Sequence, residues 1–265
     1  MERIGTARTV WYGWDVRADT PGVPQLPAGP DIGAMTDDDL AALYAWPEAA
    51  GPTVRGNMIT SLDGGAALDG RSGGLGNEAD RRLFAVLRDL ADVILVGSGT
   101  VRAEGYAGVE LDETRRARRV RWGRPASPPP IAVVTGRGLD PRLPLFTDFE
   151  TRPIVITPRA AASRVPEAAE PLFAGDDTVD LTAAIRGLAD RGLRRIHCEG
   201  GPDLLGRLVA DDLLDECCLT VAPLLLGSAS TRLLPSVLAE PVSWVPVSLR
   251  VDGAHLFARY RRSRP

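Results

Sequence analysis

The chain has 265 residues, 44% of them hydrophobic, which is enough to bury the core of one large domain or two small ones. Its formal net charge of -4 argues against a dedicated nucleic-acid-binding protein, whose phosphate contacts need a basic surface. No stretch approaches the roughly 20 apolar residues that cross a bilayer, and the N-terminus lacks a signal-peptide pattern, so we expect a cytoplasmic protein without membrane contact.

The scarce residue types exclude several kinds of chemistry. Lysine is absent, which excludes Schiff-base catalysis, pyridoxal phosphate attachment and a Walker-type phosphate lysine. Neither His197 nor His255 lies near another plausible ligand, and the cysteines (Cys198, Cys217 and Cys218) form no CxxC pair, so no metal site is expected. We predict that all three cysteines are buried and reduced. Redox chemistry would therefore require an organic cofactor.

The N-terminal part predicts an extension followed by one domain. Residues 1–52 are rich in proline, glycine and aspartate, with one helical candidate at 37–44, and we interpret them as an extension packed on the core. From residue 53 to 265 we predict a single domain, which opens with a strand at 53–60. A helix capped by Asn77 follows and buries Leu83, Leu87 and Leu90, and residues 93–97 predict a buried strand. This order is typical of parallel strands.

The second half continues the alternation after an arginine-rich segment. Residues 115–124 hold six arginines and run into PASPPP, which predicts a solvated loop and a stiff connector. Strands are expected at 131–135 and 153–157, a helix at 180–192 that buries Ile185 and Leu188, and a strand at 194–201. A helix from Pro202, a strand at 216–227 and two strands about an Asp252-Gly253 turn complete the pattern. The predicted fold is α/β with three layers, a mostly parallel central sheet and an antiparallel C-terminal hairpin.

Two strand-to-helix turns are candidate phosphate-binding sites. Ligands of parallel sheets bind beyond the carboxyl ends of strands, where helices present free N–H groups. Residues 97–100 (Gly-Ser-Gly-Thr) and 199–202 (Glu-Gly-Gly-Pro) fit this description, although neither is a GxGxxG motif. For either turn alone, glycines that serve only a tight turn are an equally good interpretation. Asp63, in the third stretch NMITSLDGG, is by itself typical of a turn-capping residue.

In combination, these stretches resemble the pyrimidine reductase domain of riboflavin biosynthesis (5-amino-6-(5-phosphoribosylamino)uracil reductase), which has a dihydrofolate-reductase-like fold. The resemblance covers about residues 53 to 260. The matching positions are residues 61–64, Leu87, Arg88, Ala91, Asp92, residues 96–101 and 199–205, Asp215, Glu216 and residues 222–227. Several motifs in a fixed order are far more specific than any one of them.

The resemblance implies an NADPH-dependent reductase that delivers hydride to the ribosyl C1′ of a ribosylamino-pyrimidine. It assigns Glu199 and Asp63 to catalysis, and Glu199, Ser72, Arg88 and Asn57 to substrate binding. Thr135 and Arg137 would meet the 2′-phosphate of NADPH. The other implied cofactor neighbours are Ile59, Gly97, Gly99, Thr100, Val101, Glu104, Gly200, Gly201, Pro202, Asp203, Leu204 and Leu205.

The chain also departs from the family pattern. Asn57 stands where many bacterial relatives carry a lysine, and the loop 106–113 offers no arginine for a substrate 5′-phosphate before Arg115. The zinc site of the companion deaminase needs His-x-Glu together with Pro-Cys-x-x-Cys, and this combination does not occur, so no deaminase activity is expected. The alternatives are another pterin or pyrimidine reductase, such as a dihydrofolate-reducing enzyme, and a non-catalytic nucleotide-binding protein. Family members pair through sheet edges and terminal strands, so we also expect a homodimer.

Overall fold

A computed structural model describes residues 30–227, 230–235 and 238–264, and the first 29 residues of the predicted extension lie outside this part. The described residues form a nine-stranded sheet in the order β5-β4-β3-β2-β6-β1-β7-β9-β8. In this order, the first seven strands, from β5 at the edge to β7, run parallel to one another. Strand β9 pairs antiparallel with both β7 and β8. The bounds are β1 Thr53–Ser61, β2 Val93–Gly97, β3 Ile131–Val134, β4 Ile154–Thr157, β5 Glu170–Phe173, β6 Arg195–Cys198, β7 Glu216–Ala222, β8 Trp244–Asp252 and β9 His255–Arg262.

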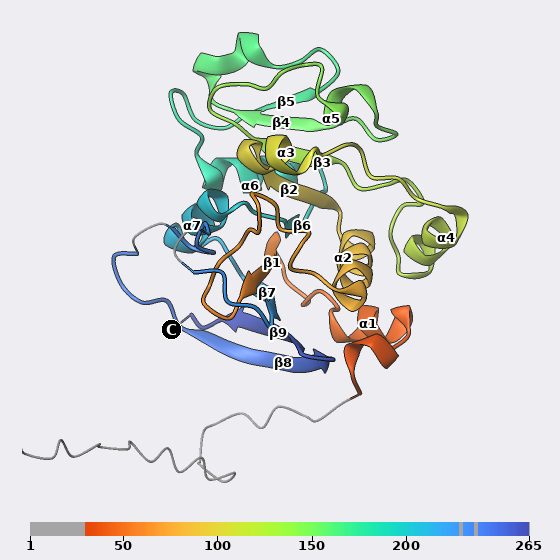
Figure 1. Ribbon diagram of the computed structural model, residues 1–265. Helices are drawn as coiled ribbons and strands as arrows, with labels where there is room; N and C mark the ends of the chain where they lie inside the picture. The colour runs from red at the N-terminus through yellow and green to blue at the C-terminus, as the bar shows by residue number, and fades with distance from the viewer. Residues whose placement is uncertain (1–29, 228–229, 236–237, 265) are drawn as a thin grey trace, which may run out of the picture.

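Helices cover both faces of this sheet, which gives the three layers that the sequence predicts (Figure 1). Alternate residues of β2 face opposite layers, because successive side chains of a strand point to opposite faces: Leu95 packs in the cluster of α6 and α7, and Ile94 packs on the other side. The bounds are α1 Asp37–Leu43, α2 Glu78–Leu90, α3 Ser98–Glu104, α4 Glu113–Arg121, α5 Pro144–Thr147, α6 Leu181–Asp190 and α7 Pro202–Ala210, with 3-10 turns at Ile32–Ala34 and Arg159–Arg164.

The described part of the extension packs on the core. Helix α1 is closed at its N-terminus by a capping box between Thr36 and Asp39. Ile32, Leu40 and Tyr44 are each 1% exposed and pack in the same cluster as α2. None of the helices in the described ranges is long and apolar enough to span a bilayer.

The arginine-rich run is helix α4, so the predicted solvated loop is wrong. Asp112 caps the helix, and Arg118 and Arg119 are buried. Arg118 pairs with the buried carboxylate of Asp89 on α2, and Arg119 donates to the Asp89 carbonyl at 2.8 Å. The end of α2 therefore supplies the acceptors that allow this cationic segment to pack inward.

Two smaller expectations also differ from the structure. The strand predicted at 216–227 ends at Ala222, because residues 224–227 turn away from the sheet toward the loop after β1. Cys198 and Cys218 are buried and free as predicted, whereas Cys217 is only partly buried. Strand β5 (Glu170–Phe173) was not predicted, since its exposed edge position gives EPLF no apolar alternation.

Candidate active site

Two adjoining cavities lie where the carboxyl ends of β1, β2 and β6 meet. The larger, about 450 Å³, extends along α2, and the smaller, about 260 Å³, lies between the turn after β2 and the turn after β6. Both are lined by Met58, Ala66, Ser72, Thr100, Glu104 and Glu199. The two cavities therefore adjoin along these six residues.

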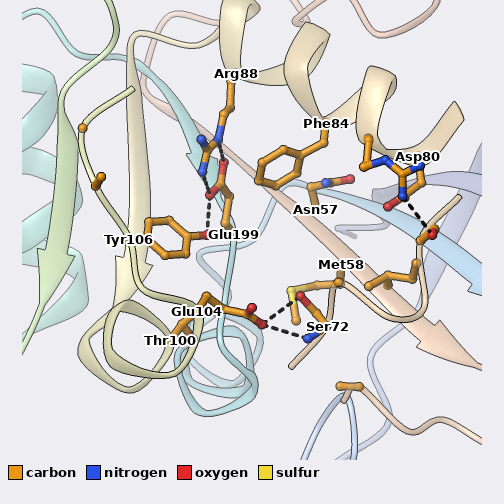
Figure 2. Close-up of a pocket in the computed structure, with 17 residues that line it drawn as sticks. Asn57, Met58, Ser72, Asp80, Phe84, Arg88, Thr100, Glu104, Tyr106 and Glu199 are labelled. Atoms are coloured by element: carbon orange, nitrogen blue, oxygen red, sulfur yellow. Dashed lines mark hydrogen bonds and ion pairs between the residues drawn. The ribbon is translucent and has the colours of Figure 1, made fainter. Parts of the chain in front are cut away.

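Helix α2 presents a polar and aromatic row to the larger cavity. Asp80, Phe84 and Arg88 all line it, and Figure 2 shows them side by side along the helix. Their spacing of four residues places them on one face. At 1.5 Å rise per residue the row spans about 12 Å.

Glu199 forms the centre of a buried ion pair at one end of this row. Its Oε1 accepts from Arg88 Nε at 2.6 Å, and its Oε2 accepts from Arg88 Nη2 at 2.7 Å and from the Tyr106 hydroxyl at 2.6 Å (Figure 2). The Glu199 side chain is 1% exposed and that of Arg88 19%. Burial raises the pKa of Glu199, but the facing guanidinium outweighs it and the pKa is lowered, so the carboxylate stays charged.

His197 lies beside this pair, on the buried side of β6. Its Nε2 is 3.6 Å from Glu199 Oε1, and neither ring nitrogen has a hydrogen-bond partner among the described residues. Complete burial lowers the pKa of His197 to about 4, against a smaller opposing effect of Glu199. His197 and Glu199 do have His-x-Glu spacing, but the described residues contain no group of three or more side chains placed to hold a metal.

A second carboxylate closes the cavity from the other side. Glu104 Oε1, at the end of α3, accepts from the Ser72 amide at 2.8 Å and from the Ser72 hydroxyl at 2.9 Å. This bond ties the loop after β1 to α3, directly over the wall that the two cavities share. Ser72 is thereby held at the wall that the two cavities share.

The smaller cavity is built around bare backbone. The Gly97 amide donates to the Gly200 carbonyl at 2.7 Å, and the Gly200-Gly201 peptide bond is cis. A Cβ at Gly201 would come within 2.5 Å of Thr100 Oγ1, so a larger residue there would displace the Thr100 hydroxyl where the two turns meet. Of the expected cofactor neighbours, this cavity is lined by Gly97, Gly99, Thr100, Glu104, Gly201, Pro202, Asp203 and Leu204.

Other expected residues lie elsewhere. Asn57 and Ile59 line the larger cavity, so Ile59 lies apart from the cavity that the other expected cofactor neighbours line. Val101 and Leu205 are 0% and 3% exposed and belong to the core clusters. Their contribution is therefore to packing beneath the cavities.

Asp63 lines neither cavity. Its carboxylate accepts from the Ser61 hydroxyl at 2.5 Å, from the Gly227 amide at 2.6 Å and from the Leu226 amide at 3.1 Å. These bonds, that of Ser61 foremost, lower the pKa of Asp63 to about 2. The carboxylate thus joins two loops as a turn-capping group, and this geometry gives no support to a catalytic role.

A third hollow, about 490 Å³, opens on the far side of α3 at the ends of β3 and β4. Arg102, Arg137 and Arg164 line it, and within the described part of the chain none of their guanidinium groups is hydrogen-bonded or ion-paired. Thr135 shapes the turn, since its hydroxyl donates to the Gly138 carbonyl at 3.0 Å. Three unpaired cations around one hollow favour an anionic ligand.

Sequence reasoning missed Tyr106, Phe84 and Asp80. Phe84 and Asp80 were detectable, because they precede Arg88 by four and eight residues on one predicted helix. Tyr106 gave no such signal: it follows the left-handed Gly105 at the end of α3, in a loop without periodicity.

Comparison with known proteins identifies the family of this chain. Residues 52–257 match the family described as RibD C-terminal domain. The chain is 30% identical over 181 residues to the 2,5-diamino-6-ribosylamino-4(3H)-pyrimidinone 5′-phosphate reductase of Archaeoglobus fulgidus, covering 66% of this chain and 82% of that relative.

Solved structures show the same fold. A pyrimidine reductase-like protein of Corynebacterium diphtheriae superposes with a TM-score of 0.74 at 27% identity, covering 85% of this chain and 99% of that one. A deaminase/5-amino-6-(5-phosphoribosylamino)uracil reductase of Thermotoga maritima superposes with a TM-score of 0.65, covering 80% of this chain and 57% of the longer protein. At 18% identity, the second likeness concerns the fold alone.

Proposed function

The chain belongs to the RibD C-terminal domain family, and from this premise we propose that it is an NADPH-dependent reductase of a ribosylamino-pyrimidine in riboflavin biosynthesis. The observation that carries the proposal is the pair of adjoining cavities, which share a wall at Thr100 and Glu199. A cofactor in the smaller cavity and a substrate in the larger one would meet at this wall. Such contact is what hydride transfer requires.

The residues present fit a nicotinamide dinucleotide. The smaller cavity offers the bare backbone at Gly97, Gly99 and Gly201 for a pyrophosphate, with the start of α7 beside it. When bound, the cofactor supplies the hydride. The protein's own contribution is to position the two ligands and to exclude water around the Arg88–Glu199 pair.

The preference for NADPH over NADH rests on the third hollow. Arg137 follows β3, Arg164 ends the 3-10 turn after β4, and Arg102 lies on α3 beside the smaller cavity. A Cβ at Gly138 would lie 2.7 Å from Arg164 Cβ, so the two segments that carry Arg137 and Arg164 are in direct contact. Together these guanidinium groups would bind the 2′-phosphate that distinguishes NADPH.

The proposed reaction reduces C1′ of the substrate. Hydride adds to C1′, the bond from C1′ to the ring oxygen O4′ breaks, and O4′ takes a proton, which leaves an open ribityl chain. The pyrimidine would be either the 2-amino-4-pyrimidinone or the uracil form. Asn57, Ser72, Arg88 and Glu199 would be its neighbours, because all four line the larger cavity. Glu199 acts through the orientation of Arg88 and Tyr106, since three of its roughly four acceptor positions are taken.

We also propose a homodimer formed through the C-terminal hairpin. Val245, Leu249, Val251 and Leu256 on β8 and β9 are between 38% and 43% exposed, and β8 is the edge strand of the sheet. An exposed apolar face on an edge strand favours pairing with a second copy. Deaminase activity is not part of the proposal.

Two candidate substrates, each tested with NADPH, separate this function from its rivals. NADPH oxidation with the ribosylamino-pyrimidine supports the proposal, and oxidation with dihydrofolate alone supports another reductase on the same fold. NADPH binding without reduction of either substrate would indicate a nucleotide-binding protein. NADPH at one hundred times its Kd should stabilise the fold by about 2.7 kcal/mol, and an unchanged melting temperature would exclude the cofactor assignment.

A further inference from the structure

The larger cavity contains one carboxylate that none of the roles above uses. Asp80, Glu104 and Glu199 are its acidic lining residues. Glu199 is occupied by Arg88 and Tyr106, and Glu104 by Ser72. Asp80 has one partner, the Thr220 hydroxyl, which donates to Oδ1 at 2.7 Å, and its Oδ2 accepts no hydrogen bond from any described residue.

A purely structural role for this carboxylate does not account for its position. Asp80 is the third residue of α2, where an acid commonly turns back to the amide of the capping residue. In α1, Asp39 makes that bond to Thr36, but Asp80 makes no such bond to the cap Asn77. Its side chain instead reaches Thr220 on β7, which is 2% exposed and holds the carboxylate in one orientation at the cavity wall.

The surroundings keep Oδ2 accessible and uncompensated. A Cβ at Gly76 would lie 2.6 Å from Asp80 Oδ2, so the glycine at this lining position leaves room beside that oxygen. Burial raises the pKa of Asp80, and Thr220, His255 and Arg81 offset this only in part. A half-buried carboxylate without an ion-pair partner in a cleft is typical of a ligand-binding group.

Building on the proposed function, we propose that Asp80 recognises the heterocycle of the substrate and selects a 2-amino-4-pyrimidinone ring over uracil. The 2-amino ring presents two adjacent donors, the N3–H and an N–H of the amino group, which match the two oxygens of a carboxylate. Uracil places a carbonyl oxygen where that amino group would be, and this oxygen would face Asp80 with repulsion. Phe84, one helical turn away from Asp80, lines the same cavity (Figure 2), and its aromatic face could stack on the ring.

The Asp80→Asn substitution tests this directly, because a carboxamide offers one donor and one acceptor and so matches uracil. Its oxygen still accepts from Thr220, so the fold is retained. With the wild type we expect kcat/KM for the 2-amino ribosylamino-pyrimidine to exceed that for the uracil form at least about tenfold. Asp80→Asn should lower kcat/KM for the 2-amino substrate by about tenfold or more and reverse the preference.

Two further variants control for charge and for orientation. Glu78→Gln removes the same charge from the same helical turn at an exposed position outside the cavity, and it should leave the preference unchanged. Thr220→Val removes the hydroxyl that orients Asp80 and should weaken the preference for the 2-amino substrate. Thr220→Ser keeps a hydroxyl and should keep that preference. An unaltered preference in folded Asp80→Asn, or an equal effect of Glu78→Gln, would overturn the assignment.

Binding of the free rings separates this inference from the proposed function. The probes are 2-amino-4(3H)-pyrimidinone and uracil, added to the protein with NADP⁺ and followed by calorimetry. We expect the wild type to bind the 2-amino ring more tightly and Asp80→Asn to lose that difference. If the wild type binds this way but turns over neither substrate, the reductase proposal fails while the role of Asp80 stands. Equal binding of both rings by the wild type overturns the role of Asp80.

Discussion

Arg88 and Glu199 are 111 positions apart in the sequence, yet they form a two-point ion pair, at 2.6 and 2.7 Å, where the two cavities meet. The pair joins α2 to the turn after β6, and the Tyr106 hydroxyl completes it from the loop after α3. Three segments that line the larger cavity thereby share one electrostatic centre. A substitution in this centre should therefore alter substrate turnover more than it alters cofactor binding.

The Glu199→Gln substitution tests this relationship. The amide keeps the shape but removes the charge that compensates Arg88, whose side chain is 19% exposed. Removing one partner of a buried pair should cost about 3 kcal/mol of folding free energy, and transition-state stabilisation should fall by about 2 kcal/mol or more. NADPH affinity should change little. Urea denaturation, steady-state kinetics and cofactor titration measure the three quantities.

Glu150→Gln is the matched control, because Glu150 forms a similar two-point pair with Arg116 at the surface. There the melting temperature and the turnover should stay at wild-type values. Full activity and wild-type stability in Glu199→Gln would contradict both its substrate-side and its structural role.

The arginines of the third hollow should set the cofactor preference. Arg137→Ala and Arg164→Ala should each weaken NADPH binding by about tenfold, as expected for the loss of a hydrogen bond to a charged group. NADH binding should be unaffected, because NADH lacks the 2′-phosphate. Arg142→Ala, which removes an arginine paired with Asp140 beside the same hollow, is the control. An unchanged ratio of the two affinities in Arg137→Ala would exclude its role.

Much of this fold follows from periodicity and capping. Asn77 and the apolar spacing of Leu83, Leu87 and Leu90 predict α2 correctly, and apolar runs predict the parallel strands other than β5. The arginine-rich helix α4 was mispredicted because its buried acceptors come from α2, and such tertiary contacts leave no trace in a local window.

The site was only partly predictable for the same reason. The glycine turns and Glu199 are recognisable in sequence, because their motifs are local. Tyr106 and Thr220 contribute through partners 93 and 140 positions away, which only the fold brings together. Asp63 illustrates the opposite case, since its local interpretation as a turn-capping residue describes its contacts better than the family-based catalytic role.

Because His197 is buried, we predict that the protein loses stability in mild acid. Its pKa is lowered to about 4 in the folded protein by burial, whereas an unfolded histidine has a pKa of about 6.5. Between these values the unfolded chain binds the additional proton, so stability falls as the pH drops through this window. At pH 5 the contribution is about 2 kcal/mol. Urea unfolding at pH 7.5 and pH 5 measures the loss, which His197→Gln should reduce, and NMR signals of His197 that titrate near pH 6.5 would contradict it.

The dimer prediction can be tested on the exposed sheet face. Leu249→Asp places a charge among apolar residues of β8 and β9 and should shift the mass from dimer to monomer in light scattering. Val120→Asp, at an apolar residue that is 56% exposed on α4, should leave the dimer intact. A monomeric wild type at micromolar concentration would contradict the prediction.

The central claim is hydride transfer from the cofactor to C1′ of a ribosylamino-pyrimidine, and isotopic labelling tests it most directly. NADPH carrying deuterium at C4 of the nicotinamide, prepared in both stereochemical forms, is incubated with the protein and the 2-amino ribosylamino-pyrimidine, and the product is analysed by mass spectrometry. We predict a ribityl product with one deuterium at C1′ from one of the two labelled forms. A ribityl product without deuterium from either form, or no ribityl product despite bound NADPH, would contradict the claim.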